Sequence, residues 1–301
     1  METRAGQDSL GSIDALQGAL LRQSYIADRG LATSIYLAIK LKRPLFLEGE
    51  AGVGKTEVAK VLAQILGAEL IRLQCYEGLD VNQAVYEWNY SRQMLHIRLM
   101  EARGEKMADE DLFGPAYLLR RPLLQAISNT RANPPVLLID EIDRSDEEFE
   151  AYLLELLSDY QITIPEIGTL RAEHPPVVVI TSNRTREIHD GLKRRCLYQW
   201  IDYPSFDKEL EIVRSRAPGA PEELSRQVTA FVQELRRMEL FKSPGVAETL
   251  DWVQALTAMD QQKITRETIR DTLGVILKYQ DDIEKLSERS IDNIFARIGL
   301  D

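Results

Sequence analysis

The sequence predicts an α/β fold in which a five-stranded parallel sheet lies between helices and a small all-helical domain follows. Two observations support this. Short, almost wholly apolar runs follow prolines at 135–139 and 176–181, which is typical of strands covered on both faces, as in a parallel sheet. After residue 205 only helical patterns remain. We therefore expect a flexible tail at 1–12, an α/β domain at 13–204 and a helical domain at 205–301.

The elements can be assigned in order from the spacing of apolar residues. Helical periodicity runs through 13–42, and the strand 44–47, the helix 58–66 and the strand 69–74 follow. The stretch 76–133 is the least regular, with helical signals around 79–100 and 115–128. A helix at 147–158 and a hairpin at 160–171 lie between the two long apolar strands. The last strand is 197–202, and the helices after it are 206–215, 221–240, 246–258 and 266–299.

Composition and charge exclude several classes of protein. The chain has 301 residues and a net charge of −11, from 48 acidic and 37 basic side chains. Nucleic acid is thus a disfavoured partner, because proteins that wrap DNA normally carry a basic surplus. No apolar run approaches the roughly 20 residues that span a membrane, and the N-terminus shows no signal peptide. With two cysteines, Cys75 and Cys196, and no CxxC pair, we expect a cytoplasmic protein.

A phosphate-binding motif lies between the strand 44–47 and the helix 58–66. It matches G-x-x-x-x-G-K-[ST], and its residues are Gly49, Glu50, Ala51, Gly52, Val53, Gly54, Lys55 and Thr56. The backbone N–H groups of such a loop surround phosphate, and the following helix adds its positive end. We expect Lys55 to reach the β- and γ-phosphates of ATP and the Thr56 hydroxyl to ligate Mg²⁺. The chain has no Asn-x-x-Asp guanine-reading motif, which favours ATP over GTP.

Two carboxylates follow the predicted strand 135–139. Asp140 and Glu141 come directly after it, and the carboxyl ends of such strands face the crevice where ligands bind. We expect Asp140 to hold Mg²⁺ together with Thr56, and Glu141 to deprotonate the attacking water. This pair favours an ATP hydrolase over a kinase. Acidic residues are also favoured at helix starts, which accounts for the acids at 146–148 without a site.

Further polar residues follow the next strands. Asn183 comes just after the strand 176–181 and could bond the attacking water or the γ-phosphate, although an Asn there is commonly a turn residue. The cationic run Lys193-Arg194-Arg195 precedes the last strand. It is either a helix C-terminus that favours cations or an arginine finger for the γ-phosphate of a neighbouring subunit.

The order of these parts resembles that of the AAA+ ATPases. The run 140–145, Asp-Glu-Ile-Asp-Arg-Ser, is similar to the Asp-Glu-Ile-Asn-Arg-Ala of the MoxR family. The segment 160–171 looks like the pre-sensor-1 hairpin of that clade, and 76–100 looks like its helix-2 insert. The stretches 25–33 and 36–56 look most like the CoxD-like branch. The resemblance covers about residues 20–290.

The resemblance implies roles for particular residues. Glu141, Asn183 as sensor 1 and Arg195 as the arginine finger would be catalytic, with Arg194 the reserve candidate for the finger. ATP and Mg²⁺ would be the cofactors. One position departs from the family: where MoxR proteins read Ser-Pro-Arg at sensor 2, this chain reads Ser243-Pro244-Gly245, so the arginine is missing there.

The resemblance also implies an assembly and partners. It predicts a homo-oligomeric ring, a hexamer, that remodels or matures a protein partner such as a metalloenzyme. Members of the family act with a von Willebrand factor A domain protein. Aromatic residues of the insert (Tyr86, Trp88 and Tyr90) would line a central pore, although aromatics in such a segment commonly pack locally. We expect the acidic segment 140–150 of one subunit to face the basic segment 184–195 of the next.

Two alternatives remain open at this stage. The first is a DNA-handling AAA+ motor, which would show a basic pore and a salt-sensitive, DNA-stimulated ATPase. The second is a nucleotide-gated scaffold that binds ATP and scarcely hydrolyses it. The presence of both Glu141 and Asn183 argues against the scaffold.

Overall fold

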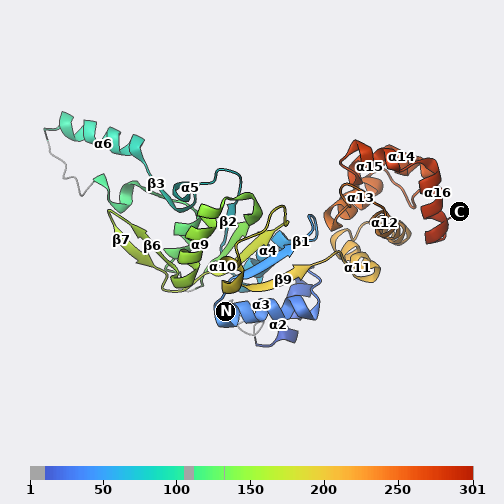
Figure 1. Ribbon diagram of the computed structural model, residues 1–301, viewed down its shortest axis with the longest axis horizontal. Coiled ribbons are helices and arrows are strands. Elements are labelled where there is room, and N and C mark those ends of the chain that lie inside the picture. The colour runs from blue at the N-terminus through green and yellow to red at the C-terminus, as the bar shows by residue number, and fades with distance from the viewer. Residues whose placement is uncertain (1–10, 105–111, 132, 301) are drawn as a thin grey trace. The chain divides into compact units, whose positions relative to one another are not determined.

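The computed structural model describes residues 11–104, 112–131 and 133–300 (Figure 1). The chain divides into two compact units, which we call the first unit and the second unit. Within the described ranges, the first unit comprises residues 1–19, 28–48 and 56–200. The second comprises residues 20–27, 49–55 and 201–301.

A five-stranded sheet is the centre of the α/β region. Its strands are β1 (Leu45–Gly49), β2 (Leu70–Gln74), β5 (Val136–Asp140), β8 (Val177–Ser182) and β9 (Leu197–Ile201), in the order β2-β5-β8-β1-β9. The pairs β2–β5, β5–β8 and β8–β1 are parallel. Every residue of β1 and β5 is buried, as expected of strands covered on both faces. The predicted parallel sheet is thus confirmed, and the carboxyl ends of β1, β5 and β8 lie along one edge.

Two helices precede the sheet where the sequence predicts one continuous helical stretch. They are α2 (Ile13–Arg22) and α3 (Arg29–Leu41). Ser24 takes a left-handed conformation with φ 57°, and the Asp28 carboxylate caps α3 by accepting from the Leu31 amide at 2.8 Å. Periodicity alone missed this break, because apolar residues continue on both sides of the turn.

Helices pack against the sheet through apolar stripes. α4 (Lys55–Leu66) follows β1, α9 (Glu147–Asp159) follows the short 3-10 helix η2 (Ile142–Arg144), and α10 (Asp190–Arg195) precedes β9. α9 buries Phe149, Leu153 and Leu156 in one cluster with Leu137 and Ile139 of β5. The spacing of four and then three residues places all three on one helix face. After α9, β6 (Gln161–Ile164) and β7 (Gly168–Arg171) pair as an antiparallel hairpin.

The insert between β2 and β5 differs from the expected pair of helices. It contains α5 (Val81–Val85), β3 (Tyr86–Trp88), α6 (Tyr90–Ala102), η1 (Pro115–Tyr117), β4 (Leu118–Arg120) and α8 (Pro122–Ile127). β3 and β4 pair antiparallel, with Tyr86 opposite Arg120. The helical structure predicted for these two short segments is therefore wrong. Figure 1 shows α6 at the outer end of the insert, away from the five-stranded sheet.

The aromatic residues of the insert divide between the interior and the surface. Trp88 is buried, and its ring meets that of Phe113 edge-on at 5.3 Å. Trp88 therefore packs locally and is not free to line a pore. Tyr90, at the start of α6, is exposed.

The second unit contains the helices after β9. They are α11 (Phe206–Arg216), α12 (Glu222–Leu235), α13 (Val246–Ala258), α14 (Arg266–Ile276), α15 (Gln280–Lys285) and α16 (Glu288–Ile298). Phe231, Trp252 and Phe295 lie in its buried core. The prediction of a single helix over 266–299 is wrong. The backbone of Leu277 is extended, and a new helix begins after Ser287, whose hydroxyl accepts from the Ser290 amide. In the described ranges no helix has both the length and the apolar character to cross a membrane.

Candidate functional site

The phosphate-binding loop, residues 49–55, connects β1 to α4. Gly52 and Gly54 have φ of 76° and 92°, a left-handed conformation that costs glycine little. The Lys55 ammonium donates to the backbone oxygens of Gly49 at 2.8 Å and of Glu50 at 2.5 Å. The lysine is thus held over its own loop, which is suited to bind phosphate through backbone N–H groups and one cation.

Asp140 ends β5 and is almost fully buried. Its Oδ1 accepts hydrogen bonds from the hydroxyls of Thr56 (2.9 Å) and Thr181 (2.6 Å). Its Oδ2 accepts from Nε and Nη2 of Arg72, at 3.0 and 2.6 Å. Thr56, the residue directly after the loop, therefore contacts the carboxylate that the sequence assigns to the metal.

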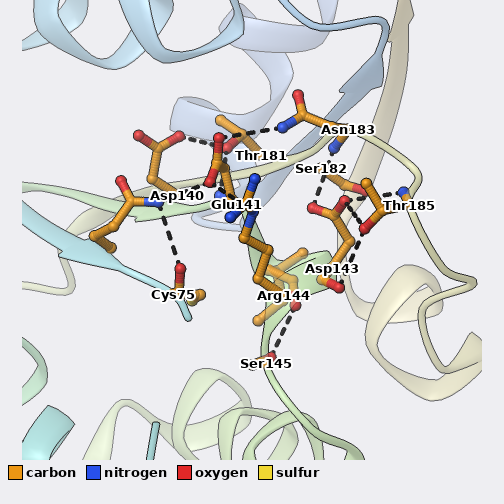
Figure 2. A network of polar contacts seen from close by, with 12 residues as sticks. Cys75, Asp140, Glu141, Asp143, Arg144, Ser145, Thr181, Ser182, Asn183 and Thr185 are labelled. Atoms are coloured by element: carbon orange, nitrogen blue, oxygen red, sulfur yellow. Dashed lines mark hydrogen bonds and ion pairs between the residues drawn. The ribbon is translucent and has the colours of Figure 1, made fainter. Parts of the chain in front are cut away.

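Glu141 occupies a strained position directly after β5. Its φ is 56° and its ψ is 52°, which is uncommon outside glycine and tends to occur at functional sites. Its amide donates to the Thr181 hydroxyl at 2.9 Å. The turn directs its carboxylate toward two donors, Asn183 Nδ2 at 3.2 Å and Gln74 Nε2 at 3.0 Å. It also forms an ion pair with Arg144, whose Nε lies 3.1 Å from Oε2. Figure 2 shows Asp140, Glu141, Thr181 and Asn183 in one network.

Asp143 fixes the loop that carries Asn183. Its buried carboxylate accepts from the backbone amides of Asn183 (3.1 Å) and Thr185 (3.0 Å) and from the Thr185 hydroxyl (2.7 Å) (Figure 2). Burial by itself would raise the pKa of Asp143. The hydrogen bonds from Thr185 and Asn183 outweigh it and hold the pKa below the ordinary value. The charged form of Asp143 therefore positions Asn183 beside Glu141.

The donor set around Asp140 fits Mg²⁺. Among the described residues, no group of three or more His, Cys, Asp or Glu side chains could hold a metal ion. Mg²⁺ commonly binds through one or two carboxylates, waters and the phosphates of its substrate. Asp140 and the Thr56 hydroxyl supply hard oxygen atoms of that kind at the C-terminal side of the phosphate-binding loop.

Arg195 lies apart from this network and binds within its own chain. Its Nε donates to the Ser158 hydroxyl of α9 at 2.7 Å, and its Nη1 donates to the Gly191 oxygen at 3.4 Å. Arg194 and Arg195 are both exposed. Arg43 binds their backbone oxygens, at 2.7 Å from Arg194 and 3.1 Å from Arg195, so the backbone is held while the two side chains face solvent.

The acidic segment 140–150 and the basic segment 184–195 meet within one chain. Arg186 Nη2 donates to the Ser145 oxygen at 2.5 Å and pairs with the buried Glu150. Arg186 and Glu150, which belong to the segments expected to meet across subunits, are thus paired within one chain, and for the other members the expectation stays a prediction. Glu147 and Glu148 remain exposed and are available to a neighbour.

The second unit has no arginine at the predicted sensor-2 position. Gly245 caps α13, and its amide donates to Glu248 at 2.9 Å. Arg236 Nε donates to the backbone oxygen of Pro244, the residue before Gly245. Both Nη atoms of Arg236 bind the buried Glu209. Arg236 is therefore fully engaged and cannot substitute for a sensor-2 arginine in this conformation.

Sequence reasoning missed four residues of the network: Arg72, Gln74, Asp143 and Thr181. A signal for the first two existed, because Arg72 and Gln74 alternate with the buried Ile71 and Leu73 along β2. Polar side chains two residues apart share one face of a strand, and β2 pairs in register with β5, which places Gln74 opposite Asp140.

Fold and site together define a nucleotide hydrolase with a phosphate-binding loop, because a carboxylate pair and a polar strand end follow that loop in a parallel sheet. Residues 44–196 match the family model of the AAA domain, dynein-related subfamily. The match spans just over half of the chain, so the protein belongs to this family and is an ATP hydrolase of the AAA+ class.

Individual relatives are distant. The chain is 22% identical over 245 residues to an uncharacterized protein of Staphylococcus aureus (strain bovine RF122 / ET3-1), which covers 77% of this chain and 85% of that protein. Among solved structures, two point-mutant forms of RuvB from Thermotoga maritima share 16% identity, each with a TM-score of 0.50. They cover 98% and 96% of this chain and 86% and 85% of those chains. At this identity the likeness shows the fold alone.

Proposed function

We propose that the protein is a MoxR-like AAA+ ATPase of the CoxD-like branch, which hydrolyses ATP with Mg²⁺ in a homo-oligomeric ring and thereby remodels a protein partner. The observation that carries this proposal lies at the ends of the neighbouring strands β5 and β8. Asn183 donates to the Glu141 carboxylate, and the Thr181 hydroxyl links the Glu141 amide to the Asp140 carboxylate. A carboxylate for the metal, a carboxylate for the water and an amide to orient that water are the groups that hydrolysis needs.

Each residue then has a defined task. The backbone of 49–54 and the Lys55 ammonium bind the phosphates, and Thr56 and Asp140 hold the metal. When bound, Mg²⁺ neutralises charge on the phosphate oxygens. Glu141 accepts the proton of the attacking water, and Asn183 fixes both that water and the Glu141 carboxylate, to which it donates at 3.2 Å.

The exposed position of Arg195 supports the proposed ring. This exposed guanidinium is bonded to Ser158 of its own α9 and has no bond to the Glu141 network among the described residues. We propose that it completes the site of a neighbouring subunit as the arginine finger, with Arg194 as the alternative finger. The ring is a hexamer on this proposal.

The partner assignment rests on resemblance. The run 140–145 and the β6–β7 hairpin are similar to those of MoxR proteins, which implies a protein client such as a metalloenzyme, reached through a von Willebrand factor A domain protein. The chain has no Asp-x-Ser-x-Ser motif of its own, so the partner would bring the metal-ion-dependent adhesion site. Both cysteines are buried and free, which suits a cytoplasmic protein.

Mixing two inactive variants tests the shared site. Lys55→Ala should lose ATP binding, and Arg195→Ala should bind ATP yet hydrolyse it about 10³-fold more slowly. A mixture of the two should recover part of the phosphate release, since an intact Arg195 can then face an intact Lys55. Arg194→Ala decides between the two candidate fingers: it should keep the wild-type rate if Arg195 is the finger and lose hydrolysis if Arg194 is the finger.

Three results would contradict the proposal. Mixed subunits that co-assemble without recovery would exclude a shared site. A particle that stays monomeric by light scattering, with and without a slowly hydrolysed ATP analogue, would exclude the ring. A hydrolysis rate stimulated by duplex DNA and suppressed by salt would favour a DNA-handling motor.

A further inference from the structure

Arg72 is the one side-chain cation that reaches Asp140 in the described part of the chain. Both its Nε and its Nη2 donate to Asp140 Oδ2, at 3.0 and 2.6 Å. The exposed fractions of the two side chains differ greatly, 51% for Arg72 and 2% for Asp140. A buried carboxylate is thus neutralised by a guanidinium whose other side is open to water.

The two oxygens of Asp140 have different surroundings. Oδ1 accepts from the neutral hydroxyls of Thr56 and Thr181, whereas Oδ2 has only Arg72 as a donor among the described residues. A buried carboxylate is costly unless it is paired and hydrogen-bonded, and Arg72 supplies the positive charge that the hydroxyls of Thr56 and Thr181 do not. A divalent cation on Asp140 would supply positive charge in place of the guanidinium.

We propose that Arg72 is the resident counter-cation of the metal site: it competes with Mg²⁺ for Asp140 and withdraws toward solvent when the metal binds. This inference rests on the proposed function, because it assigns a control to the same metal site. Arg72 is a positioning residue here and touches no reacting atom. Its neighbour on the same face of β2, Gln74, accepts from Arg72 Nη2 at 2.5 Å and keeps the guanidinium aligned.

The competition predicts a change in the coupling between Mg²⁺ and nucleotide. Without metal, loss of Arg72 removes the guanidinium from Asp140, although the hydroxyls of Thr56 and Thr181 still donate to it. The negative charge of Asp140 then repels the phosphates of ADP more strongly. With Mg²⁺ the same loss removes a competitor. Arg72→Met should therefore weaken ADP binding in EDTA and leave it equal or tighter in Mg²⁺.

The experiment is a titration of full-length protein with fluorescent ADP, with EDTA and with saturating Mg²⁺. The quantity compared is the dissociation constant of ADP in EDTA divided by that in Mg²⁺. The binding of Mg²⁺ to free ADP is the same for every variant and therefore cancels when variants are compared. We expect this ratio to rise about three- to fivefold in Arg72→Met, toward the upper end of what an exposed ion pair contributes. Arg72→Lys, which keeps the charge, should return it to within about twofold of the wild type.

A matched control separates this effect from a general loss of charge. Arg131 forms an exposed pair with Glu69 at 2.6 Å, and Arg131→Met should leave the ratio unchanged. If Arg72→Met does not fold, Arg72→Gln gives the same test with a side chain that can still donate a hydrogen bond.

An unchanged or reduced ratio in Arg72→Met or Arg72→Gln would overturn the inference, because Arg72 would then not oppose the metal. That result differs from a failure of the proposed function. In the latter case the wild-type protein itself would release no phosphate from ATP, whatever the ratio measured in Arg72→Met.

Discussion

Two arginine–carboxylate pairs, one in each unit, use the same chemistry in opposite surroundings. In the second unit the exposed fractions of the side chains are 6% for Arg236 and 0% for Glu209. Their two nitrogen–oxygen contacts are 2.6 and 2.7 Å. In the first unit Asp140 is as deeply buried, but its partner Arg72 is half exposed.

The difference separates a structural pair from an exchangeable one. Arg236 also donates to the Pro244 oxygen at 2.7 Å and lies 4.6 Å from the centre of the Tyr203 ring, so no side of its guanidinium is free. Arg72 can move into water without losing a packed environment. A buried pair of the first kind holds helices in place, whereas one of the second kind can give up its carboxylate to a metal.

The largest effect on stability is expected from breaking the buried pair of Arg236 and Glu209. Arg236→Met should lower the free energy of unfolding by about 3–5 kcal/mol, because Glu209 is left buried and unpaired. Urea denaturation of the full chain, followed by circular dichroism, measures it. In the double variant with Glu209→Leu most of this loss should disappear, since no buried charge remains.

The control for this change is the exposed pair of Arg214 and Glu222 on the surface of the second unit. Arg214→Met should leave the urea midpoint nearly unchanged. If the double variant is as unstable as Arg236→Met alone, the packing of the arginine matters more than its charge, and the comparison between the two pairs fails.

A smaller effect is expected from Asp143, a buried carboxylate that the described chain stabilises with neutral donors alone. Asp143→Asn should lower the free energy of unfolding at pH 7 by about 1.5–3 kcal/mol, the range of hydrogen bonds to a charged group. Because the folded-state pKa of Asp143 is below its usual value of 3.8, this contribution is complete above that value. It is lost as the pH falls through the lowered folded-state pKa.

Unfolding free energies of both proteins between pH 7 and about pH 3 measure this difference. The gap between the wild type and Asp143→Asn should be constant near neutrality and shrink below about pH 4. A gap that widens as the pH falls has the opposite sign and would mean that Asp143 is protonated in the folded protein.

The sequence was most informative where one strand or one motif determined the answer. The sequence predicted the five strands of the sheet to within two residues at each end. For β1, β5 and β8 the signal was burial on both faces, which leaves a nearly continuous apolar run. Asp140, Glu141 and Asn183 were placed at strand ends for the same reason. Contacts between distant segments were not predictable: β3 and β4 are three residues each and are strands only because they pair.

The contacts made by the site residues are likewise contacts between distant segments, which the sequence did not predict. The alternation along β2 places Arg72 on a polar face of the strand. It does not indicate that Arg72 reaches Asp140, since the two meet through the register of β2 with β5. The left-handed Glu141 likewise depends on its surroundings, because the Thr181 hydroxyl from β8 holds its amide. Strain of this kind contradicts local preference and is found where tertiary contacts impose it.

The central claim is that Glu141 activates water in an ATP-hydrolysing site, and one comparison tests it directly. Phosphate release and ATP binding should be measured side by side for the wild type and Glu141→Gln. The amide keeps the size of the side chain but cannot accept the proton, so ATP should stay bound while the rate falls about 10²–10⁴-fold. A Glu141→Gln protein that hydrolyses ATP at the wild-type rate would contradict the account.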